Sequence, residues 1–214
     1  MFLALPLLHP GDLFDPAALL QGAGPWVLAV IVVIVFIETG LLFPFLPGDS
    51  LLFTAGLLSI PLGLPLYVLV PAAALAAIVG DQVGYSIGKT FGQRLFKPDA
   101  RLFKSAYRDR ADQFFLRYGA RSLVLARFVP IVRTFIPPIV GTSSLPYRRF
   151  LLWNAIGGIG WALALSLAGF WLGKIPFIAN NVDLIAVVIV AASVVPVGID
   201  LLRRRASTPL REEG

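Results

Sequence analysis

The chain has 214 residues, of which 57% are hydrophobic and only 14% are charged, and its mean hydropathy is +0.84. A soluble globular domain carries about 25% charged residues, so this composition excludes an ordinary soluble protein. The sequence has no cysteine and a single histidine, His9, which excludes disulfides, thiolate metal sites and multi-histidine centres. The net charge of +6 does not predict a nucleic-acid partner, because basic residues in a membrane protein mark its cytoplasmic loops.

Long apolar runs predict the fold class. Residues 150–172 contain no charged residue, and neither do residues 51–80. Runs of about 18 or more apolar residues predict membrane-spanning helices. We therefore expect an all-α integral membrane protein, a polytopic helical bundle. Residues 1–22 carry Asp12 and Asp15 but no Lys or Arg, and we interpret them as an external leader or interfacial segment that precedes a single transmembrane domain over residues 23–202.

The first part of this domain contains a broken segment. Residues 23–37 are apolar over 15 positions, fewer than the roughly 20 that a span needs. The sequence then passes Glu38 and the break Pro47-Gly48-Asp49 before apolar sequence resumes. A break of this kind between two acids predicts a re-entrant hairpin over residues 23–60 with its tip at Pro47 and Gly48. Three full spans before the basic loop would fit the charge pattern equally well, so that alternative stays open.

One span and a basic loop follow. Residues 65–88 are expected to cross the membrane, and the stripe of Gly80, Gly84 and Gly88 suits close helix packing. Residues 89–121 carry nine Lys or Arg and three Asp, so we expect this loop to be cytoplasmic. Within the loop, aromatic residues at three- and four-residue spacing over 101–118 predict an amphipathic helix on the membrane surface.

The C-terminal part predicts a second hairpin. Spans at 150–172 and 184–202 return the chain to the side on which they begin, and the basic tail 203–214 is expected to be cytoplasmic. Residues 122–146 must then enter and leave on the cytoplasmic side, which predicts a re-entrant hairpin with Pro130, Pro137 and Gly141 at its breaks. Two opposed, Pro-broken hairpins are typical of an inverted-repeat transporter whose site lies at the membrane centre. The N-terminus is expected to be external.

Charged residues inside these hairpins are the candidate site. A charge at the bilayer centre costs about 2.5–3.5 kcal/mol, so four unpaired charges would cost about 10–14 kcal/mol. Such side chains must pair, contact water or bind a ligand. The residues concerned are Glu38, Asp49, Arg127 and Arg133.

Two interpretations of these charges remain open. In the first, the acids only neutralise the arginines. In the second, Arg127 and Arg133 bind phosphate oxygens, because guanidinium groups present planar donor forks. Glu38 and Asp49 would then exchange protons, because desolvation favours the neutral carboxyl. Asp81 is a further candidate, either functional or the partner of a cation such as Lys89.

Several motifs resemble signatures of the DedA family of bacterial membrane proteins, over roughly residues 20–175. The matching segments are residues 36–40 (FIETG), 43–49 (FPFLPGD), 80–89 (GDQVGYSIGK) and 127–137 (RFVPIVRTFIP), followed by Asn154, Gly158 and Trp161. The resemblance implies two opposed re-entrant hairpins in the cytoplasmic membrane. It also implies transport of the lipid carrier undecaprenyl phosphate, dependence on the proton motive force, and a site made of Glu38, Asp49, Arg127 and Arg133.

We therefore expect a proton-linked flippase for a lipid phosphate, with membrane lipids and protons as partners and with no cofactor and no metal. A homo-oligomer is compatible with this expectation. A proton-coupled antiporter of small ions or drugs is one alternative, in which the acids bind the substrate and the arginines act as counter-ions. A passive phospholipid scramblase is another. An enzyme is not expected, because an intramembrane phosphatase would need a second histidine or a cluster of metal ligands.

Overall fold

The computed structural model describes residues 16–41, 46–95, 113 and 117–175. These residues form helices and no strands. In chain order the elements are α1 (Pro16–Gly22), the short 3-10 helix η2 (Gly24–Trp26), α2 (Val27–Gly40), α3 (Gly48–Leu57), α4 (Leu66–Leu95), α6 (Ser122–Ala126), α7 (Pro130–Thr142) and α8 (Tyr147–Leu172). The predicted span 184–202, the basic tail and most of the predicted amphipathic helix lie outside the described residues.

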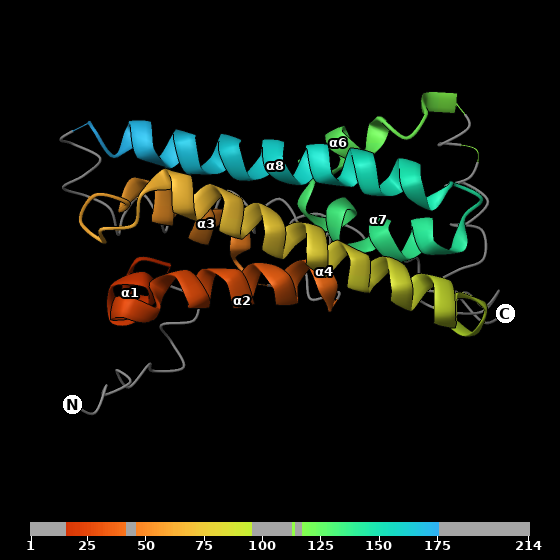
Figure 1. Cartoon of the computed structure of the whole chain (residues 1–214), viewed down its shortest axis with the longest axis horizontal. Helices are drawn as coiled ribbons and strands as arrows, with labels where there is room; N and C mark the ends of the chain where they lie inside the picture. Colours follow the sequence, from red (N-terminus) through yellow and green to blue (C-terminus); the bar gives the residue numbers. More distant parts are fainter. Residues whose placement is uncertain (1–15, 42–45, 96–112, 114–116, 176–214) are drawn as a thin grey trace, which may run out of the picture.

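Two of the described helices are long and apolar enough to cross a membrane, α4 over Leu66–Gly92 and α8 over Tyr147–Leu172. At 1.5 Å per residue each is about 40 Å long, more than the roughly 30 Å of a hydrocarbon core. The predicted span 150–172 falls within α8, and the predicted span 65–88 falls within α4 except for its first residue, Pro65. Figure 1 shows α4 and α8 running side by side in opposite directions along the whole molecule.

The N-terminal helices form a bent pair. Pro16–Gly22 and Gly24–Gly40 together are apolar enough for a third span, but they are bent by 115° at a short break. Gly24 adopts a positive φ of 51° there, a conformation that favours glycine, and Pro25 follows it. The sequence pattern assigns residues 1–22 to a leader, whereas Leu19 and Leu20 of α1 are buried in the main apolar core. Residues 16–22 are therefore packed onto the helical domain.

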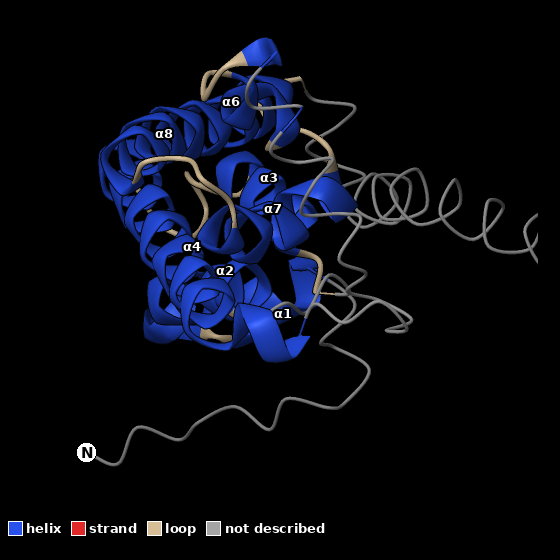
Figure 2. Ribbon diagram, turned by 90° about the vertical axis from the view of Figure 1, so that its right-hand side faces the viewer, coloured by secondary structure: helices blue, strands red, loops and turns tan. Residues whose placement is uncertain are grey.

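Two helix–break–helix pairs occupy opposite ends of the molecule. Figure 1 shows α2 along the first half of α4 and α7 along its second half. The other member of each pair, α3 or α6, packs mainly on α8. Viewed along the bundle in Figure 2, α2, α4 and α8 form an arc around the shorter helices α3 and α7. The broken ends of the short helices therefore lie at the middle of the bundle, enclosed by the two long helices.

Glycines on one face of α4 let both pairs approach closely. A Cβ built on Gly40 of α2 would lie 3.1 Å from the Cα of Gly80, and one built on Gly88 would lie 2.6 Å from the Cα of Pro138 in α7. Contacts this short leave no room for a side chain, so the backbones themselves pack together. The predicted stripe of small residues thus has a packing role in this structure.

The prolines of residues 122–146 act differently from the pattern that the sequence suggests. The helix break falls at residues 127–129, and Pro130 occupies the first turn of α7, where its missing N–H costs nothing. Pro137 and Pro138 lie inside α7 and do not break it. Their side chains and backbone fill the space beside Gly84 and Gly88 of α4, so packing holds this helix together where local propensity would end it.

Candidate functional site

The helix breaks bring charged side chains together in the interior. Glu38 lies near the end of α2, Asp49 in the first turn of α3 and Arg133 in the first turn of α7. Arg127 follows the last residue of α6, and Asp81 lies near the middle of α4. All are buried except Asp49, whose side chain is 29% exposed. We refer to these five residues as the charge cluster.

Arg133 is the centre of one half of the cluster. Its Nη1 donates a hydrogen bond to Asp49 Oδ1 at 2.6 Å, and its Nη2 donates to Glu38 Oε1. The indole Nε1 of Trp161, on α8, donates to the same Asp49 oxygen at 2.7 Å. One guanidinium group therefore joins helices α2, α3 and α7, and α8 takes part through Trp161.

Arg127 is the centre of the other half. Its Nη1 donates to Asp81 Oδ2 and also, at 2.9 Å, to the side-chain oxygen of Asn154 on α8. Asp81 is only 2% exposed. An isolated buried carboxylate is very costly, so this pairing explains how α4 tolerates an acid in its middle.

Trp161 lies between the two halves. The guanidinium carbons of Arg133 and Arg127 are 5.0 and 5.8 Å from the centre of its ring, within the range in which an aromatic face attracts a cation. Gly158, one turn earlier on α8, packs against Ile78 of α4 and lies beside Arg127: a Cβ at this position would be 3.0 Å from Ile78 Cγ1 and 3.5 Å from Arg127 Cζ. One face of α8, formed by Asn154, Gly158 and Trp161, thus supports both arginines.

Gly48 fixes the position of Glu38. A Cβ on Gly48 would collide with Glu38 Oε2, so the carboxylate rests against the backbone where α3 begins. The positive end of the helix dipole lies at this point and favours a carboxylate. Of the predicted backbone positions, Pro47, Gly48 and Pro130 lie at helix starts beside the cluster. Pro137 and Gly141 instead pack α7 against α4, away from the helix breaks.

The structure assigns partners that the sequence pattern left open. Asp81 pairs with Arg127 rather than with Lys89, whose ammonium lies 6.0 Å from the centre of the Tyr85 ring. Glu38 and Asp49 share Arg133 instead of dividing the two arginines between them. Asn154 and Trp161 were not among the predicted site residues. The available signal was their spacing with Gly158, which places all three on one face of an apolar helix.

The charge cluster has more carboxyl than guanidinium groups, and it contains N–H donors without a partner among the described residues. It contains three carboxyl and two guanidinium groups, so its formal charge is −1 when all are ionised. The Nε atoms of Arg127 and Arg133 are buried and have no hydrogen-bond partner among the described residues. Buried donors are rarely left unpaired. The arrangement can therefore offer N–H groups to an anion, and its excess carboxylate can take up a proton or another cation.

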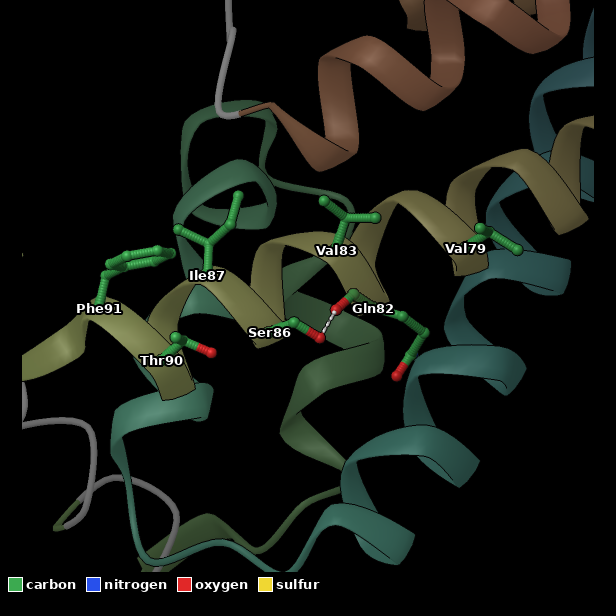
Figure 3. A pocket seen from close by; sticks show the side chains of 7 residues that line it. All are labelled: Val79, Gln82, Val83, Ser86, Ile87, Thr90 and Phe91. Atoms are coloured by element: carbon green, nitrogen blue, oxygen red, sulfur yellow. Dashed lines mark hydrogen bonds between the residues drawn. The ribbon is translucent and has the colours of Figure 1, made fainter.

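A groove of about 340 Å³ runs along another face of α4. Figure 3 shows the seven residues that line it, all from this helix: Val79, Gln82, Val83, Ser86, Ile87, Thr90 and Phe91. Ser86 donates its hydroxyl hydrogen to the backbone oxygen of Gln82 at 2.7 Å, within the helix. No residue of the charge cluster lines this groove, since the turn of the helix separates Gln82 from its neighbour Asp81.

Fold and site together define a helical membrane protein with a buried ion-pair cluster where two broken helix pairs meet. Residues 43–170 match the VTT domain. Protein DedA of Escherichia coli K12 is 42% identical over 193 residues, which cover 88% of this chain and 88% of that protein. The chain therefore belongs to the DedA family of VTT-domain membrane proteins.

Two mycobacterial proteins are also similar. An uncharacterized membrane protein of Mycobacterium tuberculosis is 48% identical over 191 residues, covering 86% of this chain and 84% of that protein. One of Mycobacterium leprae is 41% identical over 192 residues, covering 89% and 85%. No solved structure matches the chain.

Proposed function

We propose that this protein moves a lipid phosphate of the undecaprenyl phosphate type across the cytoplasmic membrane, linked to the proton motive force. The observation that carries the proposal is the pair of buried guanidinium groups that retain unpartnered N–H donors beside exchangeable carboxyl groups. Guanidinium groups suit phosphate oxygens because their donors lie in one plane and can bind two oxygens at once.

In this proposal the two broken helix pairs are re-entrant hairpins that enter from opposite membrane faces. Their arrangement at opposite ends of α4 supports this placement (Figure 1). Asp81 lies about 22 Å from the start of α4, roughly halfway along a helix long enough to cross the membrane. The charge cluster would then lie near the bilayer centre, the position at which inverted-repeat transporters bind substrate.

The proposed orientation places the N-terminus outside and both the loop 89–121 and the tail 203–214 in the cytoplasm. It is supported by the excess of basic residues in that loop and that tail. In this orientation the membrane potential acts on each charge that crosses with about 2.3 kcal/mol per 100 mV. A lipid phosphate carried with protons would thus feel a smaller electrical barrier than the bare anion.

A proton-coupled antiporter of small ions or drugs is the second candidate, and one observation favours it. The cluster has one carboxyl group more than it has guanidinium groups, and an excess buried carboxylate attracts cations. In that mechanism the arginines are counter-ions and no phosphate binds. A passive scramblase would move lipids without any response to a pH gradient.

Reconstitution in liposomes tests these candidates. The purified protein is inserted into vesicles that contain labelled polyprenyl phosphate in one leaflet, and transfer to the other leaflet is measured with and without an imposed pH gradient. The proposal expects transfer that the gradient accelerates. Transfer indifferent to the gradient would indicate a scramblase, and no transfer of the lipid by folded protein would favour the antiporter.

A further inference from the structure

The contacts of Arg133 suggest how protons and phosphate are linked at the proposed lipid-phosphate site. Both Nη groups of this guanidinium are already occupied, one by Asp49 and the other by Glu38. A guanidinium binds a phosphate bidentately either through both Nη groups or through Nε and one Nη. The Nε of Arg133 has no partner among the described residues, but either mode includes an Nη that already donates to a carboxylate, so a bidentate phosphate competes with Asp49, Glu38 or both.

The charges around Arg133 lead to the same conclusion. It is faced by Glu38 from α2 and Asp49 from α3, while Asp81 of α4 is taken by Arg127 in the other half of the cluster. From α8, the uncharged side chain of Trp161 donates a hydrogen bond to Asp49. With all groups ionised the cluster already has a net negative charge. A phosphate anion that entered would therefore be repelled, in a place with little water to screen the charges.

Protonation removes both obstacles at once. A carboxyl group that gains a proton loses its charge and its attraction to the guanidinium. With Glu38 and Asp49 both protonated, the formal charge of the cluster rises from −1 to +1. A phosphate that carries one negative charge then makes it neutral. Asp49 is the less enclosed of the two carboxyls, because its side chain is 29% exposed whereas that of Glu38 is 5% exposed.

We propose that Glu38 and Asp49 compete with the lipid phosphate for Arg133, so that the phosphate binds only as the two carboxylates take up protons. Two N–H···O bonds to carboxylates are exchanged for two to phosphate oxygens, and the protons come from water by way of Asp49. The inference rests on the proposed function. It makes the protein a symporter of protons and an anionic lipid, with two protons per phosphate.

The test measures proton uptake when a soluble short-chain lipid phosphate binds to the full-length protein in detergent. A methyl-esterified headgroup is the probe, because a phosphodiester does not titrate near neutral pH and any uptake then belongs to the protein. Calorimetry in two buffers of different ionisation enthalpy counts the protons. In the pH range where both carboxyls are ionised in the free protein, we expect the affinity for the probe to fall by up to about a hundredfold for each unit by which the pH rises. Linkage gives a factor of about ten for each proton taken up.

Variants locate the protons. Glu38→Gln removes one competitor, so we expect it to bind the probe more tightly than wild type at alkaline pH. Its pH dependence should fall to about tenfold per unit. Asp49→Asn should behave in the same way. Thr39→Val is the matched control, because Thr39 is buried next to Glu38 and its hydroxyl donates only within its own helix; it should leave proton uptake unchanged.

The outcomes separate the inference from the function on which it rests. Binding by wild type without proton uptake, or weaker binding by Glu38→Gln at alkaline pH, would overturn the competition while leaving phosphate transport intact. If folded wild type binds neither the methyl-esterified probe nor the unesterified short-chain lipid phosphate, the proposed function is rejected. The wild-type proton count needs no variant, so the test holds even where a substitution prevents folding.

Discussion

Replacing Arg133 with lysine tests whether the cluster uses the guanidinium fork or only its charge. The wild-type side chain donates from two nitrogens to acceptors on two different helices, Glu38 of α2 and Asp49 of α3. A lysine ammonium keeps the charge, but it is a single point that cannot reproduce this planar pair of donors. Losing one charge-assisted hydrogen bond costs about 1.5–3 kcal/mol. If a phosphate takes the place of the carboxylates, Arg133→Lys should weaken its binding about 10- to 100-fold.

The assay is binding of a short-chain polyprenyl phosphate to purified wild type, Arg127→Lys and Arg133→Lys in detergent. Lys89→Arg is the matched control, since Lys89 is an exposed cation over the Tyr85 ring. This variant replaces a lysine with an arginine, the reverse of the substitution made at the other two positions. It should bind like wild type. Equal affinities for wild type and both lysine variants would refute the phosphate grip and leave the arginines as counter-ions.

Three further predictions concern packing, Trp161 and orientation. Gly88→Ala should lower the free energy of unfolding by about 1–3 kcal/mol, because the added Cβ meets the backbone of Pro138. Gly160→Ala is the control and should not lower it, because a Cβ there meets nothing within 4 Å. Thermal unfolding in detergent compares the two variants. Trp161→Phe should cost about 1 kcal/mol in the same assay, because Asp49 loses its indole donor but the arginines keep an aromatic ring; an unchanged midpoint would contradict this role. Single cysteines at Ser105 and Ser207 should resist an impermeant thiol reagent in intact cells, while one at Leu13 should react; labelling of either of the first two would reverse the orientation.

The residues of the cluster could be found from the sequence, but their pairing could not. Glu38, Asp49, Arg127 and Arg133 stand out because a charge in an apolar segment is costly wherever it lies along the chain. Which acid meets which arginine depends on how the helices pack. Asp81 and Arg127 are 46 positions apart, and only the contact of α4 with α8 and the end of α6 brings them together.

The helix boundaries show the same division. The long apolar runs predict α4 and α8 because length and hydropathy are local properties. The course of α7 through Pro137 and Pro138 is not local, since it depends on the neighbouring glycines of α4. Asn154 and Trp161 do not stand out as site residues in the sequence, because an amide and an indole in an apolar helix do not carry the cost of a charge. Their role is visible only from what they contact.

The glycine face of α4 has a consequence for how the molecule keeps its alignment. Most packed helices hold their register because ridges of side chains fit into grooves. Where the backbone of Gly88 meets that of Pro138, and Gly80 meets Gly40, such ridges are absent, so the surfaces resist sliding only weakly. The ion pairs from Arg127 to Asp81 on α4 and from Arg133 to Glu38 on α2 therefore fix the segment that joins the end of α6 to the start of α7. Loosening those pairs would let this segment shift along α4 and α2.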